Sequence, residues 1–261
     1  MHVLILSASR HIGYFAALRL LAKGETVSLF VRSANRFDDD QAIQGHIRAG
    51  RARVVVGDGL NEEDVRRAVH SDSFDFILIS IGATQIKMTF PHPTITPADI
   101  CERSTKNVLA ALRSSPHETS RATRVIAITS AGMGRQGFAA LPLAWKPVYW
   151  WLLPKMHADK QNMERALGGA AGRTDWGEEA VVQASPAHEQ AWLNAMIVRP
   201  AHLTDSESLA DKQSGGKEAY RVGEYLRGIW SISRKDVAHF IVEEAIPNFA
   251  KYRNRAVDIC Y

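Results

Sequence analysis

The stretch VLILSASRHIG at residues 3–13 decides the fold class of this chain. Four apolar residues typical of a buried strand lead directly into a short polar turn, after which apolar residues recur at helical spacing through Leu20. A strand, a tight turn and a helix in this order begin a Rossmann fold, in which N–H groups at the helix end bind a pyrophosphate. Gly13 stands where such a helix packs closely on its strand, whereas Ser7 and Arg10 occupy positions where this turn favours glycine.

Apolar runs and helical spacing alternate along the rest of the chain, a pattern typical of βαβ units. Further strands are expected at 27–31, 52–56, 74–81, 124–129 and 195–198, and 256–259 is a candidate for the last one. Runs this uniformly apolar indicate strands that are buried on both faces. The pattern therefore predicts an α/β fold, a Rossmann-type doubly wound parallel sheet with flanking helices and a small C-terminal substrate-binding part.

Several helix boundaries carry local signals. Gly24 is expected to end the first helix. Asn61, Thr96 and Ser233 precede helical patterns and are expected to cap them, with Pro97 in the first turn after Thr96.

The composition excludes several classes of protein. The chain has 261 residues, of which 46% are hydrophobic and 23% charged, and it has 2 cysteines. A disulfide scaffold needs more cysteines, and a disordered chain has fewer apolar residues. No run approaches the ~20 apolar residues that span a membrane. We therefore expect one cytoplasmic NAD(P)-binding Rossmann domain over residues 1–261, with Cys101 and Cys260 reduced and a surface insertion at 168–190, which is rich in small and acidic residues.

Charge and motifs exclude further functions. The formal net charge is +4, from 32 Lys and Arg scattered among 28 Asp and Glu, and no basic block with interleaved aromatic residues is present, so no nucleic-acid partner is expected. The 10 histidines form no metal-binding motif, and no G-x-S-x-G elbow occurs. Neither a metal site nor a serine hydrolase is expected.

Two positions after the predicted second and third strands favour a phosphorylated dinucleotide. An acidic residue after the second strand binds the ribose of NAD, whereas arginine accommodates the 2′-phosphate of NADP. Here Arg32 is followed by Ser33 and Arg36, and Arg10 can join them from the first turn. The alternative is that these arginines are ordinary solvated surface residues that bind no phosphate. The Gly57–Asp58 pair is expected either to face the adenine or to form a purely structural turn.

Six short motifs together resemble one family. They are VRS at 31–33, GDGL at 57–60, ITSAG at 128–132, HADKQNMERAL at 157–167, IVRPAHLTD at 197–205 and ISRKDVAHFIV at 232–242. In this order and spacing the chain resembles the NmrA-like atypical short-chain dehydrogenase/reductases, in particular fungal NAD(P)-binding oxidoreductases of secondary metabolism. It is more distantly similar to flavin reductase/biliverdin reductase B.

The fold and the resemblance together imply a set of site residues. The expected cofactor-binding residues are Ser7, Ser9, Arg10, His11, Ile12, Gly13, Arg32, Ser33, Arg36, Asp58, Gly59, Leu60, Ile81, Gly82 and Thr129. Lys160 matches the family lysine, but Met156 stands where the tyrosine of a Tyr-x-x-x-Lys pair would be. The resemblance places Ser130 near the nicotinamide and His202 at the substrate as a possible proton donor.

Each of these roles has a structural alternative. Ser130 can satisfy backbone groups at a strand end, and His202 can be a buried, hydrogen-bonded histidine. Lys160 can pair with Glu164 one helical turn later instead of acting at the nicotinamide ribose.

An aromatic segment follows the fifth predicted strand, from Phe138 to Leu152, and Ile86, Met88, Phe90 and Pro91 follow the fourth. These residues can roof a pocket for a flat aromatic substrate, or form a subunit interface or ordinary core.

The sequence therefore predicts an NADPH-dependent oxidoreductase that transfers a hydride to or from a bulky aromatic or conjugated carbonyl. It is expected to bind NADP(H) and a small aromatic molecule and not to associate with a membrane. Its expected oligomeric state is a monomer or a homodimer. Two alternatives stay open: a non-catalytic NADP-sensing regulator, and a Rossmann-derived isomerase, cyclase or dehydratase without net redox.

Overall fold

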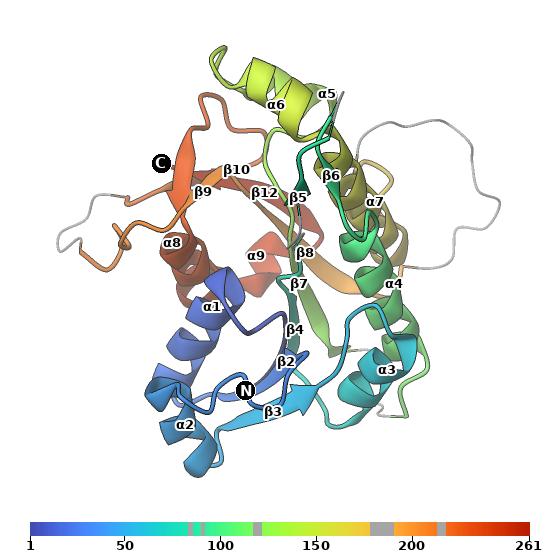
Figure 1. Ribbon diagram of the computed structural model, residues 1–261, viewed down its shortest axis with the longest axis vertical. Coiled ribbons are helices and arrows are strands. Elements are labelled where there is room, and N and C mark those ends of the chain that lie inside the picture. Colours follow the sequence, from blue (N-terminus) through green and yellow to red (C-terminus); the bar gives the residue numbers. More distant parts are fainter. Residues whose placement is uncertain (83–85, 90–91, 117–121, 178–190, 213–217) are drawn as a thin grey trace.

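A single twisted sheet of eight strands runs through the middle of the molecule, as Figure 1 shows for this computed structural model. The structure describes residues 1–261 except 83–85, 90–91, 117–121, 178–190 and 213–217. The strand order is β10-β12-β8-β7-β4-β1-β2-β3, and every pair is parallel except β10 with β12. The strands are β1 His2–Leu6, β2 Thr26–Val31, β3 Ala52–Val56, β4 Phe76–Ile79, β7 Arg124–Ile128, β8 Asn194–Pro200, β10 Arg221–Gly223 and β12 Arg255–Cys260.

Helices cover both faces of this sheet. On the left in Figure 1 lie α1 (His11–Ala22), α2 (Gln41–Arg48) and α8 (Arg234–His239), and α8 continues into a π-helical turn over Phe240–Ala245. On the right lie α3 (Glu62–His70), α4 (Ile100–Arg113) and α7 (Pro154–Ala171). The doubly wound fold predicted from the sequence is confirmed.

Smaller elements lie beyond the main sheet. Helices α5 (Gly134–Ala140) and α6 (Lys146–Leu152) form one end of the molecule, at the top of Figure 1, and α9 (Phe249–Tyr252) packs on the left-hand core. Two short strand pairs complete the fold, β5 (Ile86–Lys87) with β6 (Thr94–Ile95) and β9 (His202–Thr204) with β11 (Ser231–Ser233).

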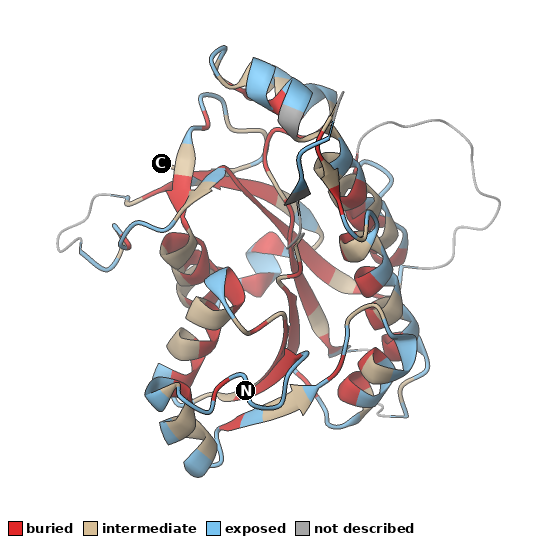
Figure 2. Ribbon diagram, in the orientation of Figure 1, coloured by how far each residue is buried: buried red, intermediate tan, exposed pale blue. Residues whose placement is uncertain are grey.

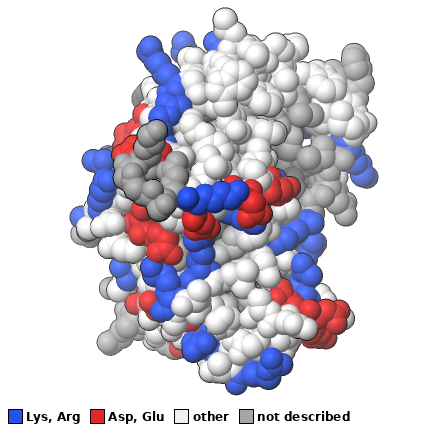
Figure 3. Space-filling view, turned by 90° about the vertical axis from the view of Figure 1, so that its left-hand side faces the viewer, with Lys and Arg blue, Asp and Glu red and all other residues white. Residues whose placement is uncertain are grey.

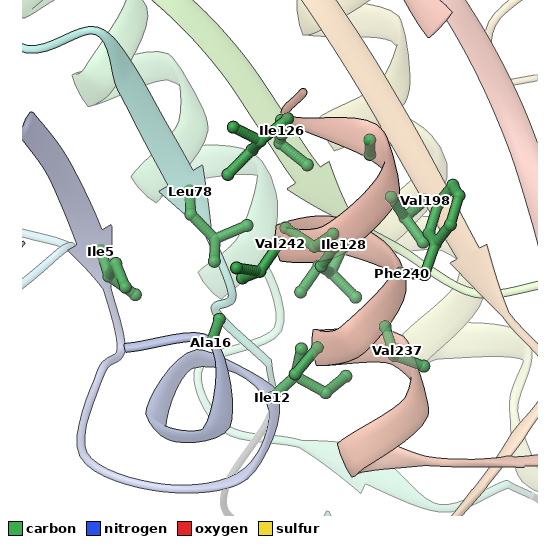
Figure 4. Close-up of a cluster of buried hydrophobic side chains, with 14 of the residues drawn as sticks. Ile5, Ile12, Ala16, Leu78, Ile126, Ile128, Val198, Val237, Phe240 and Val242 are labelled. Atoms are coloured by element: carbon green, nitrogen blue, oxygen red, sulfur yellow. The ribbon is translucent and has the colours of Figure 1, made fainter. Parts of the chain in front are cut away.

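The sheet separates two apolar cores. Its inner strands are almost entirely buried, whereas the edge strands β3 and β10 are partly exposed (Figure 2). One core joins α1, α8 and the π-helical turn to one sheet face, where Ile5, Leu78 and Val198 meet Ile12 and Phe240 (Figure 4). The other core lies between the opposite face and α3, α4 and α7. Burial of both faces is why the inner strands β1, β2, β4 and β7 are apolar at most positions.

Most of the predicted helix boundaries are confirmed. Gly24 adopts φ 81° just after α1, as expected of a helix-ending glycine. The side chain of Asn61 accepts hydrogen bonds from two backbone N–H groups of α3, and that of Ser233 accepts one from the backbone of Asp236 in α8.

The predicted cap at Thr96 is wrong. Helix α4 begins at Ile100, and its first N–H groups are satisfied from another helix instead. The carboxylate of Asp159 in α7 accepts hydrogen bonds from the backbone N–H of Cys101 and of Glu102, both at 2.9 Å. A buried tertiary partner has therefore replaced the local cap.

Two predicted segments differ from what the structure contains. The strand expected at 74–81 is shorter and ends at Ile79, and the predicted last strand, β12, is followed at the sheet edge by the three-residue β10, which the sequence did not indicate. Within the expected insertion at 168–190, residues 168–171 belong to α7 and Trp176 is buried, while 178–190 lie outside the described residues. Among the described helices, none combines the length and apolar character needed to cross a membrane.

Candidate cofactor site

The turn between β1 and α1 has a strained backbone without the usual glycines. Ser7 and His11 both adopt left-handed conformations, with φ of 65° and 58°, which cost a non-glycine residue about 1–2 kcal/mol each. Gly13 allows α1 to approach the turn closely, because a Cβ atom there would lie 2.7 Å from the carbonyl oxygen of Ser7. No side chain caps the first turn of α1, so its N–H groups stay available for an anion.

A second turn, at residues 57–60, is held in place by three helical side chains. The backbone N–H of Asp58 donates to Asp64 at 2.9 Å, and this bond is the main reason that the pKa of Asp64 is lowered. Asn107 donates to the carbonyl of Gly59 at 2.9 Å, and Arg103 donates to that of Leu60 at 3.1 Å. The turn is therefore fixed before any ligand binds.

These two turns line a cleft of about 460 Å³ at the carboxyl ends of β1, β2 and β3. Most of the predicted cofactor residues line it: Ser7, Ser9, Arg10, Arg32, Arg36, Asp58, Gly59, Leu60, Ile81 and Gly82. Sequence elements far apart in the chain thus meet at one edge of the sheet, where ligands of open α/β sheets bind.

Arginines surround one end of this cleft. Arg36 donates from Nε and Nη2 to the carbonyl oxygen of Ser9, at 3.2 and 2.6 Å, and so ties the second-strand loop to the first turn. Arg10 and Arg32 are exposed, and neither forms an ion pair with another described residue. Two arginines without an ion-pair partner among the described residues therefore line the cleft.

A smaller cavity of about 270 Å³ adjoins the cleft and shares Ser7, Arg10, Ile81 and Gly82 with it. His11 and Ile12 line it, and Lys160 and Met156 reach it from α7. Its remaining wall is largely apolar, with Ile95, Ile128 and Leu203.

Lys160 is a half-buried cation in the wall of this cavity. Its Nζ donates to the carbonyl oxygen of Thr129 at 2.5 Å. Burial lowers the pKa of its ammonium group, although the nearby acidic groups of Cys101, Asp159 and Glu164 oppose this effect. A lysine whose pKa is depressed in this way can exchange a proton more readily than a solvated one.

Glu164 does not pair with Lys160, so the ion pair considered from their spacing does not form. Its carboxylate instead accepts from Arg199 Nε at 2.9 Å and Nη2 at 2.6 Å, and from Thr129 Oγ1 at 2.7 Å. Lys160 therefore lines the smaller cavity without an ion pair to Glu164.

Other predicted residues lie outside both cavities. The side chain of Thr129 is turned to Glu164, and that of Ser33 donates to Asn35. Ser130 donates to the carbonyl of Ala131 at 3.3 Å. His202 is exposed and stacks on Trp145 with ring centroids 5.0 Å apart, so it is not the buried histidine of the structural alternative.

Ser104 was missed by the sequence reasoning. It lines the larger cleft from α4, and its buried Oγ has no hydrogen-bond partner among the described atoms. A Cβ atom on Gly59 would lie 2.9 Å from this Oγ, so glycine keeps the space beside it open. An unsatisfied buried hydroxyl is costly unless a ligand uses it, and the cleft therefore fits a polar, dinucleotide-like group. No local signal marks a serine inside a helix as functional.

Asp159 and Arg234 also line the smaller cavity without having been predicted. Asp159 caps α4, as described above, and Arg234 pairs with Asp205 at 2.8 Å. Burial, followed by Arg234 and Arg10, lowers the pKa of His11. The described residues contain no group of side chains able to hold a metal ion.

The aromatic segment is divided between core and surface. Tyr149 and Leu141 are buried, whereas Leu143 and Trp150 are 82% and 67% exposed. None of its described side chains lines either of the two cavities. Phe90 and Pro91, also expected in the roof, lie outside the described residues, as do Ala83 and Thr84 after β4.

A family model described as NAD(P)H-binding matches residues 8–246, which include both turns and Lys160. The chain belongs to this NAD(P)H-binding family. Its relatives include a protein named reductase pytE from Aspergillus terreus, which is 27% identical over 257 residues, 92% of this chain and 90% of the relative.

Solved structures agree on the fold. The anaerobilin reductase ChuY of Escherichia coli superposes with a TM-score of 0.64 at 17% identity, covering 100% of this chain and 97% of that one. Yeast methylglyoxal/isovaleraldehyde reductase Gre2, complexed with NADPH, gives a TM-score of 0.67 at 11% identity, covering 100% of this chain and 78% of its own. At these identities the likeness establishes the NAD(P)H-binding fold alone.

Proposed function

We propose that this protein is an NADPH-dependent oxidoreductase that acts on a bulky aromatic or conjugated carbonyl. The observation that carries the proposal is the arginine-surrounded end of the cleft, where Arg32 and Arg10 have no described acidic partner. Guanidinium groups suit a phosphate better than a neutral ribose. The reductase name of the fungal relative and the NADPH bound in the yeast Gre2 structure support the same cofactor.

Different residues of the cleft would bind different parts of the cofactor. Arg32 and Arg36 would hold the 2′-phosphate, and the uncapped start of α1 with its strained turn would hold the pyrophosphate. Asp58 and Ser104 would hydrogen-bond the adenosine end. When bound, the cofactor supplies or accepts the hydride.

Lys160 is the residue that we propose moves the proton. A carbonyl that receives hydride at carbon needs a proton at oxygen, and the depressed pKa of Lys160 makes its ammonium a better donor near neutral pH. The resulting neutral amine is reprotonated from water. Ser130 and His202 stay proposed as orienting groups beside the site. The apolar wall of the smaller cavity favours a substrate with a large hydrophobic surface.

Cofactor titration tests the binding half of the proposal. We expect NADPH to bind more tightly than NADH, and Arg32→Ala to weaken NADPH binding by about 10–100-fold, as loss of a charge-assisted bond does. Arg32→Ala should leave NADH affinity unchanged, and Arg48→Ala, which removes an exposed arginine of α2, serves as the control. Equal affinity for both cofactors would refute the 2′-phosphate assignment, and no binding of either would refute the oxidoreductase.

Single-turnover oxidation of NADPH against quinones and aromatic ketones tests the chemistry. Lys160→Arg keeps the charge but removes a titratable proton, so the rate should fall about 100-fold or more. An unchanged rate and pH profile would exclude Lys160 as the proton donor.

A cofactor-sensing regulator is the second candidate, because Met156 in the cavity wall replaces the phenol that short-chain reductases use. Tight NADPH binding without turnover of any carbonyl in the panel would favour it.

A further inference from the structure

One end of the molecule carries an apolar surface that no described residue covers. We call it the aromatic cap and define it by the exposed side chains Met88, Leu143, Val148, Trp150, Trp151 and Trp230. Trp150 is 67% exposed, Trp230 53% and Met88 68%. Helix α6, which supplies three of these residues, stands beyond the sheet at the top of Figure 1, and Figure 2 colours most of its outer surface as exposed. A protein in water rarely leaves several large apolar side chains together in this way.

Contacts tie α6 and the residue before it to two other parts of the chain, near Trp230 and near His92. The ring of Trp145, at the start of α6, lies 6.3 Å from that of Trp230. At the other end of the helix, His92 lies 6.1 Å from the Trp150 ring and hydrogen-bonds the carbonyl oxygen of Trp151 at 3.0 Å. The exposed indoles are therefore held in place by the fold, and are not isolated residues of a loose loop.

Two of the three parts of the chain that supply the cap carry basic residues and no acidic ones. Residues 119–158, which contain α5 and α6, include no Asp or Glu, and neither do residues 76–98, which contain β5 and β6. Lys146 and Lys155 flank α6, Arg135 lies in α5 and Lys87 precedes Met88. None of these cations forms an ion pair with a described acidic residue. In Figure 3 the uppermost part of the visible face is mostly white with blue near its margin, whereas acidic and basic side chains are mixed lower down.

We propose that the aromatic cap docks this protein on the surface of a membrane that contains anionic lipids. Tryptophan favours the boundary between headgroups and acyl chains, where its ring is buried and its N–H stays solvated. Lysines beside an interfacial helix add attraction to anionic headgroups, and apolar side chains with basic flanks are the pattern of a helix that lies in the interface. The short α6 and its neighbours would insert shallowly without spanning the bilayer.

A second copy of the chain is a poorer occupant. A two-fold contact brings the same surface of both copies together. The basic surface made by Lys146, Lys155, Lys87 and Arg135 would then face the same basic surface of the other copy. The sequence alone predicted no membrane contact because no run is long enough to span one. That reasoning did not address an interfacial surface, which appears only when the fold brings distant segments together.

Vesicle co-sedimentation of the full chain tests this proposal without any cofactor or substrate. We expect binding to phosphatidylcholine vesicles that contain phosphatidylserine, weaker binding to pure phosphatidylcholine, and release by salt. Trp150→Ser with Trp151→Ser should lower the partition coefficient about tenfold or more, since both indoles leave the interface. Lys155→Glu should lower it more than about fivefold on anionic vesicles, because one basic residue near the surface contributes about that factor and the new carboxylate is repelled as well. Lys251→Glu, an exposed lysine of α9, is the matched control and should have no effect.

Fluorescence and the oligomeric state separate the possible outcomes. A blue shift of tryptophan emission on anionic vesicles, absent in the double Trp variant, is expected if the cap inserts. Circular dichroism and NADPH affinity of that variant should match the parent chain, which excludes misfolding as the cause of lost binding. The proposal is wrong if the parent chain does not sediment with anionic vesicles, or if the double variant sediments equally well. It is also wrong if the parent chain is a dimer in solution that the double variant dissociates, because the cap is then a subunit contact.

Discussion

Replacing Asp258 with Asn should change how the stability of this protein depends on pH. Asp258 lies in β12 beside Arg199 of β8, is 3% exposed, and accepts a hydrogen bond from the backbone N–H of Leu226 at 2.9 Å. Burial raises the pKa of its carboxyl group to about 6 from the ordinary 3.8, although Arg199 and the Leu226 N–H oppose this effect. The folded chain therefore binds a proton at Asp258 in a pH range where the unfolded chain does not.

The direction and the size of the change in stability follow from this difference in pKa between the folded and the unfolded chain. Raising the pH from about 4 to about 7 removes stability, because the folded state must then bury a carboxylate that is already ionised in the unfolded state. The difference in pKa corresponds to about 3 kcal/mol of the free energy of unfolding. Asp258→Asn keeps an acceptor for Leu226 but cannot ionise. Its stability relative to the parent chain should therefore rise by about 3 kcal/mol over this range, or by about 6–12 °C in Tm.

Urea unfolding followed by circular dichroism at a series of pH values measures this difference directly. Effects of all other titrating groups cancel when the two chains are compared at the same pH. Asp39→Asn, at an exposed position, is the matched control and should give a difference that does not change with pH. A difference between Asp258→Asn and the parent chain that stays constant from about pH 4 to 7 would refute the reasoning.

Three further substitutions test the turn and the buried ion pair. Ser7→Gly should raise the free energy of unfolding by about 1 kcal/mol, because glycine adopts the left-handed conformation without strain. Thermal unfolding measures this change, and a loss of stability would show that the backbone at Ser7 is not strained. Gly13→Ala should lower stability by about 1–3 kcal/mol and weaken NADPH binding, since its Cβ would meet the Ser7 carbonyl; unchanged values in both assays would show that the close approach is not needed. Glu164→Gln should cost about 3–5 kcal/mol in urea unfolding, because it removes the carboxylate that forms the ion pair and two hydrogen bonds with the buried Arg199 guanidinium. The exposed pair serves as its control, and Glu63→Gln should cost under about 1 kcal/mol.

Most of the fold could be predicted from local pattern. Apolar runs predicted the parallel strands because the inner strands are buried on both faces. Asn61 and Ser233 cap their helices through bonds to residues within three positions. The position of the cofactor turn followed from the order strand, turn, helix. The positive φ at Ser7 could not be predicted, because serine does not favour that conformation by itself. Histidine adopts it more often than most residues, but the residue type alone does not assign it to His11.

The site was predicted in part. Residues at the ends of consecutive strands, such as Arg32 and Asp58, were found because the carboxyl ends of parallel strands meet at one edge. Ser104 and Asp159 were not found, since they lie inside helices where no spacing signals a role. Their positions in the cavities depend on how α4 and α7 pack on the sheet.

The sequence by itself determined the fold class, the cofactor end of the cleft and the basic character of its loops, because these depend on residues close together in the chain. Tertiary structure alone decided which charges pair. Glu164 is one turn from Lys160 but bonds Arg199, 35 positions away, and Asp159 caps α4 by accepting from the N–H of Cys101, 58 positions earlier. The tertiary structure also decided that Trp150 and Trp151 of α6 are exposed while Tyr149 is buried. Burial and long-range neighbours set these choices, and neither is fixed until the helices pack against the sheet.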